Sequence, residues 1–563
     1  MAQRAVSLDF TFNEKNRSQD AFPELTEAQI LRIQPLGKRR PVTTGEILFE
    51  QGDTNISFFV FLSGAMEIVQ PTCSDEKPIT YHNVRGEFTG EISMISGRRS
   101  LVRGRVTEDG EVIELTREEL QKLIQTDAEL SEILMRAFIL RRLALIERGM
   151  GDVVLLGSRH SSGTLRLREF LGRNGHPYRY VDLDSDKAAQ DILDHFHMKI
   201  EDIPLVICRG RTVLRNPSNA EVADCLGYNQ AIDSVQVRDV IVVGAGPSGL
   251  AAAVYAASEG LDVLVVENSS PGGQAGSSSK IENYLGFPTG ISGQELAGRA
   301  YTQAKKFGAD IFISRAVTKL TCDRKPYVIE LEDGTSLSAR SIIIATGAQY
   351  NKLKVPNLPL YEGLGVYYGA TYIESQLCEG EEVIVVGGGN SAGQAAVYLA
   401  QTAKKVHMLV RSSGLSETMS RYLIRRIEEN PHIELHLHTE VTALEGEGKL
   451  ERVRWQNKKS GDAEWRDIQH VFLMTGAAPG SNWLKDCVAM DERGFIKTGH
   501  DITPEELETA QWPVGRQPFV LETSLPGVFA VGDVRSGNVK RVASAVGEGS
   551  ISVHLVHRVL QEQ

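Results

Sequence analysis

Two glycine-rich turns offer the clearest chemistry in this 563-residue sequence. The first belongs to DVIVVGAGPSGLAAAVYAASEGLDVLVVEN (239–268), whose pattern predicts a strand, a helix and a second strand. Gly244 allows a tight turn, Gly246 lets a pyrophosphate approach the backbone, and Gly249 lets the helix pack closely on the strand. The helix N-terminus directs amide hydrogens and a positive dipole end at the phosphates. Glu267 closes the second strand, where its carboxylate can accept hydrogen bonds from ribose hydroxyls, so this unit predicts a dinucleotide site.

The second turn lies in EVIVVGGGNSAGQAAVYLAQTAKKVHMLVRS (382–412). It repeats the pattern with Gly387 and Gly389, and Ala392 replaces the third glycine while still allowing close packing. The second strand ends in Arg411 instead of an acid. A guanidinium at this position can pair with a 2′-phosphate, so the pattern favours NADPH over NADH. The alternative is a solvated arginine at the rim of the site.

Composition narrows the class of protein. The chain is too long for one core, and 41% hydrophobic and 24% charged residues are typical of globular domains. A net charge of −12 argues against a nucleic-acid binder, and no apolar run is long enough to span a membrane. The six cysteines form no Cys-x-x-Cys, which argues against a disulfide scaffold or a structural zinc site. We therefore expect no metal site, and the polar N-terminus lacks a signal-type apolar segment, so we expect a cytoplasmic protein.

The elements before residue 239 predict two further units. Short strands broken by glycines between about 29 and 118 indicate a small antiparallel roll. Helical spacing predicts two helices over 117–148, the second with an apolar stripe that packs either within the chain or against a second copy. Residues 151–227 alternate strands and helices, with strands at VVLLG (153–157), YRYVDLD (178–184) and DIPLVICRG (202–210) and a linker at 229–238.

Residues 239–563 resemble the low-molecular-weight thioredoxin reductase family of flavoproteins. The resemblance is carried by both turns and by PGGQAGSSSKIENYLGFP (271–288), IIIATGA (342–348), GVFAVGDVR (527–535) and KRVASAVGEGSISV (540–553). It implies that FAD occupies the first turn and a pyridine nucleotide the second, in a dimer. The FAD residues implied are Gly244, Gly246, Pro247, Ser248, Gly249, Glu267, Gly273, Gln274, Asn283, Ala345, Thr346, Gly347, Gly532, Asp533, Arg541 and Val542. The NADPH residues implied are Gly387, Gly389, Asn390, Ser391, Ala392, Arg411 and Arg421.

The chain departs from this family in the segment GVYYGATYIESQLCEG (365–380). The family's dithiol motif is matched here by Gly369-Ala370-Thr371-Tyr372. Disulfide reduction needs an attacking thiolate and a resolving thiol, and glycine and tyrosine supply neither. Cys378 is near in sequence but has no partner within the motif, and Tyr372 is expected to lie near the flavin. Ser412 and Ser416 stand where the family carries arginines, which Arg421 is expected to replace.

Residues 29–148 resemble the cyclic-nucleotide-binding domain of catabolite-activator type, through FTGEISMISGRRSLVR (88–103). The resemblance implies that Gly90 and Glu91 bind the cyclic phosphate and the ribose, while Arg99 and Ser100 bind phosphate oxygens. Arg98 is a rival to Arg99, and the ligand is cAMP or cGMP. No helix-turn-helix follows, so a transcription factor is not expected.

Residues 151–227 resemble a glutaredoxin-like thioredoxin fold without its redox cysteines. Ile203-Pro204 matches that fold's cis-proline turn, and HSSGT (160–164) occupies the helix start. His160, Ser161 and Ser162 could indicate nucleophilic catalysis, but without an acid partner a capped helix N-terminus explains them better. We expect this unit to be a structural or docking module.

We therefore expect an α/β multidomain fold with two Rossmann-like domains for FAD and NAD(P), preceded by a β-roll and a thioredoxin-fold domain. The expected segments are a polar tail (1–28), the cyclic-nucleotide-binding-like roll (29–148), the thioredoxin-like unit (149–230), the FAD domain in two parts (231–352 and 479–563) and the NAD(P)H domain (353–478).

The leading hypothesis for the function is an NADPH-linked FAD oxidoreductase that passes electrons to an unknown acceptor without a local dithiol, under regulation by a cyclic nucleotide. The alternatives are a ferredoxin or flavodoxin reductase, a non-catalytic redox sensor, and a thioredoxin reductase that uses Cys378.

Overall fold

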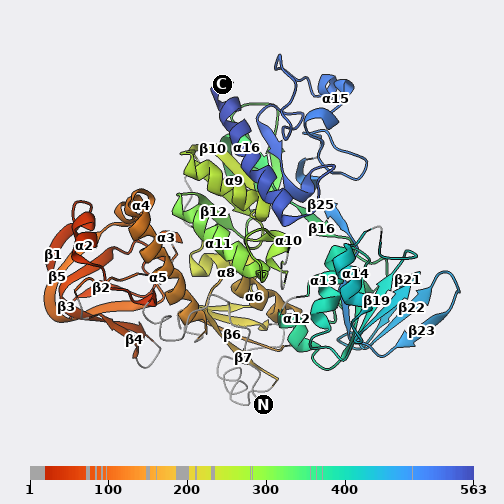
Figure 1. Ribbon diagram of the computed structural model, residues 1–563, viewed down its shortest axis with the longest axis horizontal. Coiled ribbons are helices and arrows are strands. Elements are labelled where there is room, and N and C mark those ends of the chain that lie inside the picture. The colour runs from red at the N-terminus through yellow and green to blue at the C-terminus, as the bar shows by residue number, and fades with distance from the viewer. Residues whose placement is uncertain are drawn as a thin grey trace.

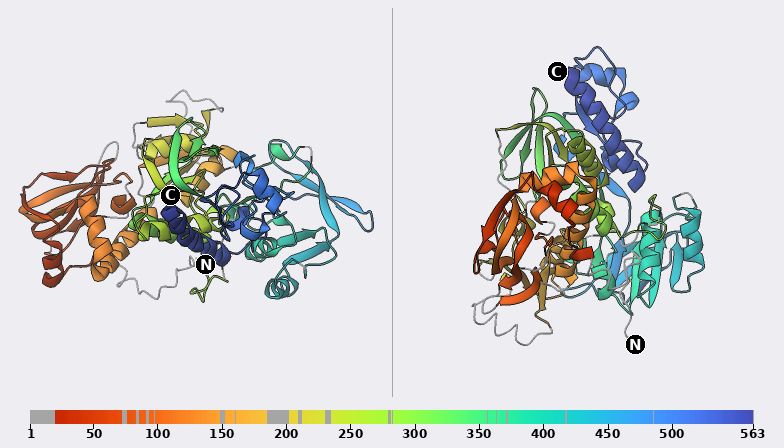
Figure 2. Two further views of the ribbon diagram at one scale, coloured as in Figure 1. Left: turned by 90° about the horizontal axis from the view of Figure 1, so that it is seen from above. Right: turned by 60° about the vertical axis from the view of Figure 1, so that its left-hand side comes forward.

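The computed structural model describes residues 20–562 apart from 72–75, 83–84, 91–92, 97, 148–151, 160, 185–201, 209–211, 230–234, 279–280, 282, 356, 363, 371, 417 and 485. The described residues form four units. The antiparallel roll lies at one end, the second nucleotide-binding unit lies at the other, and the first nucleotide-binding unit and the smaller α/β unit lie between them (Figures 1 and 2).

The roll is an antiparallel sheet with strand order β1-β5-β3-β4, and β2 pairs with β5. Its core holds the aromatic rings of Phe58, Phe88 and Phe138, all fully buried. Phe138 belongs to α5, so the apolar stripe of this helix packs within the chain, as one of the two sequence interpretations predicted. The elements are α2 (Glu27–Ile33), β1 (Lys38–Val42), β2 (Ile47–Phe49), β3 (Phe58–Pro71), β4 (Glu76–His82), α3 (Ser93–Ser96), β5 (Arg103–Leu115), α4 (Arg117–Thr126) and α5 (Ala128–Glu147).

The smaller α/β unit is a mixed sheet of order β7-β6-β8-β9, in which β6 is parallel to β7 and antiparallel to β8. The predicted cis bond at Ile203-Pro204 is confirmed. The helix expected between the second and third strands falls at 185–201, outside the described residues. The assignment to the thioredoxin fold stays a prediction. The elements are β6 (Val153–Gly157), α6 (Ser162–Arg173), β7 (Tyr178–Asp182), β8 (Leu205–Cys208), β9 (Thr212–Arg215) and α8 (Asn219–Leu226).

The first nucleotide-binding unit is built on a seven-stranded sheet of order β12-β11-β10-β15-β14-β13, with β26 on β15. Its central strand β10 begins at Val237, inside the segment that the sequence interpretation assigned to a linker. Helix α9, which follows the first strand of this unit, and helix α16, at the C-terminal end of the chain, pack side by side over this sheet (Figure 1). The elements are β10 (Val237–Val243), α9 (Pro247–Ser258), β11 (Val263–Glu267), α10 (Gly273–Gly276), α11 (Gly293–Lys306), β12 (Asp310–Ile313), β13 (Val317–Thr321), β14 (Tyr327–Leu331), β15 (Ser336–Ile344), α15 (Pro504–Thr509), β26 (Val528–Ala530) and α16 (Val542–Glu562).

The second nucleotide-binding unit is a five-stranded parallel sheet of order β17-β24-β18-β19-β20, with the three-stranded sheet β21-β22-β23 packed beside it. The chain passes twice between the nucleotide-binding units, at β16 (Ala348–Tyr350) and β25 (Ala477–Pro479). These two strands pair with each other in antiparallel orientation. The other elements are β17 (Val366–Tyr367), α12 (Tyr372–Leu377), β18 (Glu382–Val386), α13 (Asn390–Leu399), β19 (Lys405–Val410), α14 (Arg421–Glu428), β20 (Ile433–Leu437), β21 (Thr439–Glu445), β22 (Arg452–Asn457), β23 (Ala463–Arg466) and β24 (His470–Leu473).

The cysteines differ from expectation in one respect. Cys322 and Cys487 are joined by a disulfide across the first nucleotide-binding unit, with Cα atoms 5.9 Å apart, although they are 165 residues apart in the sequence. Spacing along the chain could not show this pair, because it is brought together only by the fold. No helix among the described residues is long and apolar enough to cross a membrane.

Candidate functional site

One cavity of about 2530 Å³ runs between the two nucleotide-binding units and is lined by both glycine-rich turns. A site for one small molecule is usually about 300–1,000 Å³, so this cavity has room for two dinucleotides. Of the predicted FAD residues, its lining includes Gly244, Gly246, Pro247, Ser248, Glu267, Gly273, Gln274, Asn283, Ala345, Thr346, Gly347, Asp533, Arg541 and Val542. Of the predicted NADPH residues, it includes Gly387, Gly389, Asn390, Ser391 and Arg411.

The first turn has no room for side chains at two of its glycines. Gly244 has a φ of +105°, and a Cβ there would lie 2.4 Å from the Ala345 carbonyl oxygen. A Cβ on Gly249 would lie 1.9 Å from the Gly244 carbonyl oxygen, so this glycine holds helix α9 against strand β10 instead of lining the cavity. A Cβ on Gly246 would be in ordinary van der Waals contact with the Cα of Gly273, 3.9 Å away, and Gly246 itself lines the cavity.

Two carboxyl groups of the first unit face this cavity. Glu267 is buried and accepts hydrogen bonds from the backbone amides of Ala245 (2.7 Å) and Ser269 (2.9 Å). Burial raises the pKa of Glu267, and burial likewise raises the pKa of Asp533, against the opposing charge of Lys540. The amides fix the Glu267 carboxylate in place while its other lone pairs can accept from ribose hydroxyls.

The cavity wall also carries an orphaned polar atom. Thr346 Oγ1 is buried and has no hydrogen-bond partner among the described residues. Buried hydroxyl groups normally have a partner. Together with Gly246, which lines the cavity, and the fixed carboxylate of Glu267, this atom fits a bound dinucleotide such as FAD.

The second turn repeats this geometry. Gly387 has a φ of +143°, and a Cβ there would lie 2.3 Å from the Met474 carbonyl oxygen. Ala392 is fully buried behind the turn and does not line the cavity. The atom nearest to a Cβ added on Gly389 would be the Thr418 carbonyl oxygen, 3.9 Å away. Asn390 accepts a hydrogen bond from the Ser420 amide at 2.8 Å, which ties the turn to the start of α14.

The two predicted arginines of the second turn differ in position. Arg411 is exposed and lines the cavity at the end of β19, where a 2′-phosphate would lie. Arg421, at the first position of α14, is exposed and does not line the cavity. Its neighbours Ser420 and Tyr422 line the cavity, and its compensation for Ser412 and Ser416 stays a prediction.

The segment 365–380 lies at the cavity, and none of its described residues brings a thiol to the lining. Gly369 lines the cavity, while Tyr372 begins helix α12 and its side chain is outside the described residues. Cys378 is fully buried in the core of the second unit, where its Sγ donates to the Ser375 carbonyl oxygen and burial raises its pKa to about 12. A thiol held protonated in this way is a poor nucleophile.

The smaller α/β unit contributes residues that the sequence interpretation did not assign to the cavity. Helix α6 starts at the cavity, and its lining residues are Ser162, Leu165, Arg166, Glu169 and Arg173. Arg173 Nη2 donates to the Gly273 carbonyl oxygen at 2.8 Å, so this unit holds the loop that faces Gly246. The predicted helix start is confirmed at Ser161, but its side chain makes no capping hydrogen bond. No local sequence signal could show the contact with residue 273.

The predicted cyclic-nucleotide residues are only partly assembled. Glu91 lies outside the described residues, and the Gly90 carbonyl oxygen accepts from Arg141 at 2.8 Å. Ser100 is buried and donates to the Val102 carbonyl oxygen at 2.8 Å. Arg99 points to the smaller α/β unit, where its Nη1 lies 3.5 Å from the Cys225 carbonyl oxygen.

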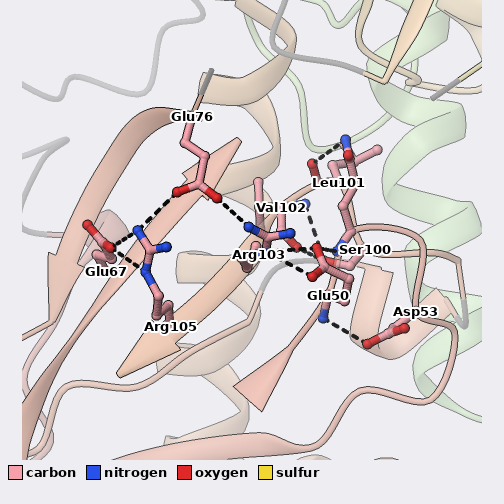
Figure 3. A network of polar contacts seen from close by, with 10 residues as sticks. Glu50, Asp53, Glu67, Glu76, Ser100, Leu101, Val102, Arg103 and Arg105 are labelled. Atoms are coloured by element: carbon pink, nitrogen blue, oxygen red, sulfur yellow. Dashed lines mark hydrogen bonds and ion pairs between the residues drawn. The ribbon is translucent and has the colours of Figure 1, made fainter. Parts of the chain in front are cut away.

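Next to Ser100, an ion-pair network crosses the roll (Figure 3). Arg103 pairs with Glu50 at 2.9 Å and with Glu76, and Arg105 pairs with Glu76 at 3.0 Å and with Glu67. Arg103 and Arg105 thus share the Glu76 carboxylate. These ion pairs join strands β3, β4 and β5 at the end of the predicted phosphate segment (88–103).

Arg98 joins the roll to both neighbouring units. Its Nη1 donates to the Asn174 carbonyl oxygen at 2.6 Å, and its guanidinium lies 4.4 Å from the ring centroid of Tyr228 in the smaller α/β unit. It also lies 5.0 Å from the ring of Tyr301 on α11 of the first nucleotide-binding unit. Such cation–π contacts contribute about 0.5–2 kcal/mol each, depending on desolvation.

Comparison with known proteins places most of the chain. Residues 238–549 match the family model described as pyridine nucleotide-disulphide oxidoreductase, and residues 39–127 match the cyclic nucleotide-binding domain. The thioredoxin reductase of Bacillus subtilis (strain 168) is 32% identical over 328 residues, which are 58% of this chain and 96% of that protein. That of Treponema pallidum (strain Nichols) is 33% identical over 56% of this chain and 95% of its own length.

A solved structure agrees with these relatives. The crystal structure of Lactococcus lactis thioredoxin reductase in its FR conformation matches with a TM-score of 0.52 and 28% identity, over 58% of this chain and all of that one. The two family models leave residues 1–38 and 128–237 unmatched. The chain therefore belongs to the pyridine nucleotide-disulphide oxidoreductase family, as a thioredoxin reductase-like oxidoreductase joined to a cyclic nucleotide-binding domain.

Proposed function

We propose that this protein is an NADPH-dependent FAD oxidoreductase that passes electrons to an acceptor without a dithiol of its own beside the flavin. The observation that supports this most directly is the cavity, which both glycine-rich turns line and to which no described cysteine contributes. When bound, FAD would accept a hydride from the reduced pyridine nucleotide and release electrons to the acceptor.

The residues of the chain would hold and orient the two cofactors. Gly246 and the N-terminus of α9 would bind the FAD pyrophosphate, and Glu267 would bind its ribose hydroxyls. Thr346 Oγ1 would find the partner that it lacks among the described residues. Asp533, which lines the cavity, would hold the ribityl chain, as the family resemblance implies.

The smaller α/β unit would act as a structural module. Arg173 holds the carbonyl oxygen of Gly273, and Gly273 packs against Gly246 of the first turn, since a Cβ on Gly273 would lie 3.0 Å from the Gly246 Cα. We infer that this unit keeps the flavin loop in its binding conformation and closes one side of the cavity. It would not contribute redox chemistry, because neither Cys208, which is buried, nor Cys225 lines the cavity, and no cysteine stands at the start of α6.

The acceptor would receive electrons directly from the flavin. Cys378 is not suited to a relay, because it is buried, has a raised pKa and does not line the cavity. A one-electron carrier protein such as ferredoxin or flavodoxin, a small molecule and oxygen are the acceptors to compare. A screen of these acceptors with the NADPH-reduced protein distinguishes them.

The Gly249→Ala substitution tests whether flavin occupies the first turn. The added Cβ would meet the Gly244 carbonyl oxygen, so helix α9 must move away from β10 and the phosphate site is lost. We expect the purified variant to retain little FAD, measured by absorbance after desalting. Gly298→Ala, in helix α11 with open space around it, is the matched control and should stay yellow. Equal FAD content in the two variants would contradict the assignment.

The Arg411→Ala substitution tests the proposed choice of NADPH. A hydrogen bond to a charged group contributes about 1.5–3 kcal/mol, so the NADPH concentration for half-maximal flavin reduction should rise about 10- to 100-fold, with little change for NADH. Stopped-flow absorbance measures both. Arg421→Ala should have a smaller effect because this residue is outside the cavity lining. The assignment of Arg411 to the 2′-phosphate is contradicted if Arg411→Ala leaves the NADPH concentration for half-maximal flavin reduction unchanged. Slow reduction of the wild-type flavin by both NADPH and NADH would favour a redox sensor.

We further propose that a cyclic nucleotide regulates the enzyme through the segment at 98–100. Arg99, the predicted phosphate ligand, contacts the smaller α/β unit, and its neighbour Arg98 contacts that unit and α11. A bound phosphate would draw an arginine away from these contacts. The arrangement with these arginine contacts and the arrangement without them would then differ in their affinity for the cyclic nucleotide, which is the requirement for allosteric coupling.

Melting curves with cAMP or cGMP test this regulation. A ligand at 100 times its Kd adds about 2.7 kcal/mol to the free energy of unfolding, so one of the two should raise the Tm of the wild-type roll. Arg99→Ala should abolish the shift, or Arg98→Ala should if Arg98 holds the phosphate. Arg85→Ala, an exposed arginine of the same roll, is the control. The absence of any shift with either nucleotide would remove the regulatory proposal.

A further inference from the structure

Three metal-binding side chains meet on the second nucleotide-binding unit, away from its cavity. His407 on β19 and Glu434 and His436 on β20 have ligand atoms that all lie within 4.8 Å of one another. The strands pair in parallel with His407 opposite Glu434 and Leu409 opposite His436. Alternate residues of a strand face the same side, so all three side chains share the face that β21, β22 and β23 cover.

The spacing of their atoms is that of ligands around one ion. His407 Nδ1 is 3.1 Å from His436 Nε2. Glu434 Oε1 is 3.5 Å from His436 Nε2, and Glu434 Oε2 is 3.9 Å from His407 Nδ1. With metal–ligand bonds of about 2.0–2.1 Å, two ligands of a tetrahedral Zn²⁺ ion lie about 3.3 Å apart.

A fourth residue orients the first histidine for this role. Glu382 Oε2 lies 3.2 Å from His407 Nε2, on the side of the ring that faces away from the cluster. A carboxylate there accepts a hydrogen bond from Nε2–H, so the neutral ring keeps its lone pair on Nδ1, which faces His436. A carboxylate behind a histidine ligand in this way is a recurring feature of metal sites.

The surroundings hold both rings in place. His407 is 3% exposed, and the Trp455 ring lies 5.4 Å from the His407 ring and 5.1 Å from the His436 ring. The Glu434 side chain is 44% exposed and leaves a path from solvent.

We propose that His407, His436 and Glu434 bind a divalent transition metal ion such as Zn²⁺, with water completing the coordination. Two histidines and one carboxylate are a ligand set suited to Zn²⁺. In the structure without an ion, Lys405 pairs with Glu434, and metal binding replaces that pair. Because β20 is the edge strand of its sheet, the ion would fix it to β19. None of the three residues lines the dinucleotide cavity, so this site does not depend on the proposed reaction.

Titration calorimetry with ZnCl₂ tests the site on the full-length, FAD-loaded protein after treatment with a chelator. We expect one Zn²⁺ per chain in the wild type and a rise in Tm on binding. His436→Gln and Glu434→Gln should each weaken Zn²⁺ binding at least tenfold, and Glu382→Gln should weaken it about 10- to 100-fold by releasing His407. His500→Gln, which removes an exposed histidine of the other unit, should keep the wild-type affinity.

The pattern among the variants decides the outcome. The proposal is overturned if His436→Gln and Glu434→Gln bind Zn²⁺ as tightly as the wild type, or if His500→Gln weakens binding equally. Flavin absorbance and metal-free melting of each variant report its folding. Glu434 is exposed enough that its variant gives an answer even if substitution of His436 lowers stability.

Discussion

The whole arrangement depends on how closely the backbone approaches itself at the first glycine-rich turn. A Cβ at Gly249 would lie 1.9 Å from the Gly244 carbonyl oxygen, so only glycine lets α9 start directly at the end of β10. That placement directs the amides of the helix at the cavity and puts the Glu267 carboxylate beside the turn, where the Ala245 amide fixes it. The second turn has a close backbone contact like that of Gly244, because a Cβ on Gly387 would lie 2.3 Å from the Met474 carbonyl oxygen. The two turns therefore face one cavity.

The N-terminal units are linked to this cavity through arginine side chains. Arg173 holds the loop that faces the first turn, and Arg98 connects the roll with the smaller α/β unit and with α11. The roll and the cavity are thus joined by a chain of direct contacts. The predicted phosphate segment of the roll is part of that chain, so the proposed regulation by a cyclic nucleotide would act through these contacts.

The sequence predicted those parts of the structure that depend on local pattern. The glycine turns, Glu267 and the helices after the roll follow from residues near one another in the chain. The cis bond at Ile203-Pro204 was predicted from the resemblance to a thioredoxin fold. The pairing of Cys322 with Cys487, separated by 165 residues, depends on tertiary packing and could not be read from spacing.

The same limit explains what the sequence missed at the candidate sites. Arg173 reaches Gly273 across 100 residues, and the cluster of His407 and His436 forms because two parallel strands pair in register. For Arg421 the family resemblance suggested a role at the cavity, but the start of α14 leaves its side chain exposed outside the lining.

Anaerobic titration of the FAD-loaded protein with NADPH tests the central claim most directly, because it counts the electrons that the chain can store. If the flavin has no thiol partner, about one equivalent of NADPH per flavin should bleach it completely, since each of them carries two electrons. Uptake of a second equivalent, or a thiolate–flavin charge-transfer band during the titration, would show that a disulfide exchanges electrons with the flavin and would contradict this account.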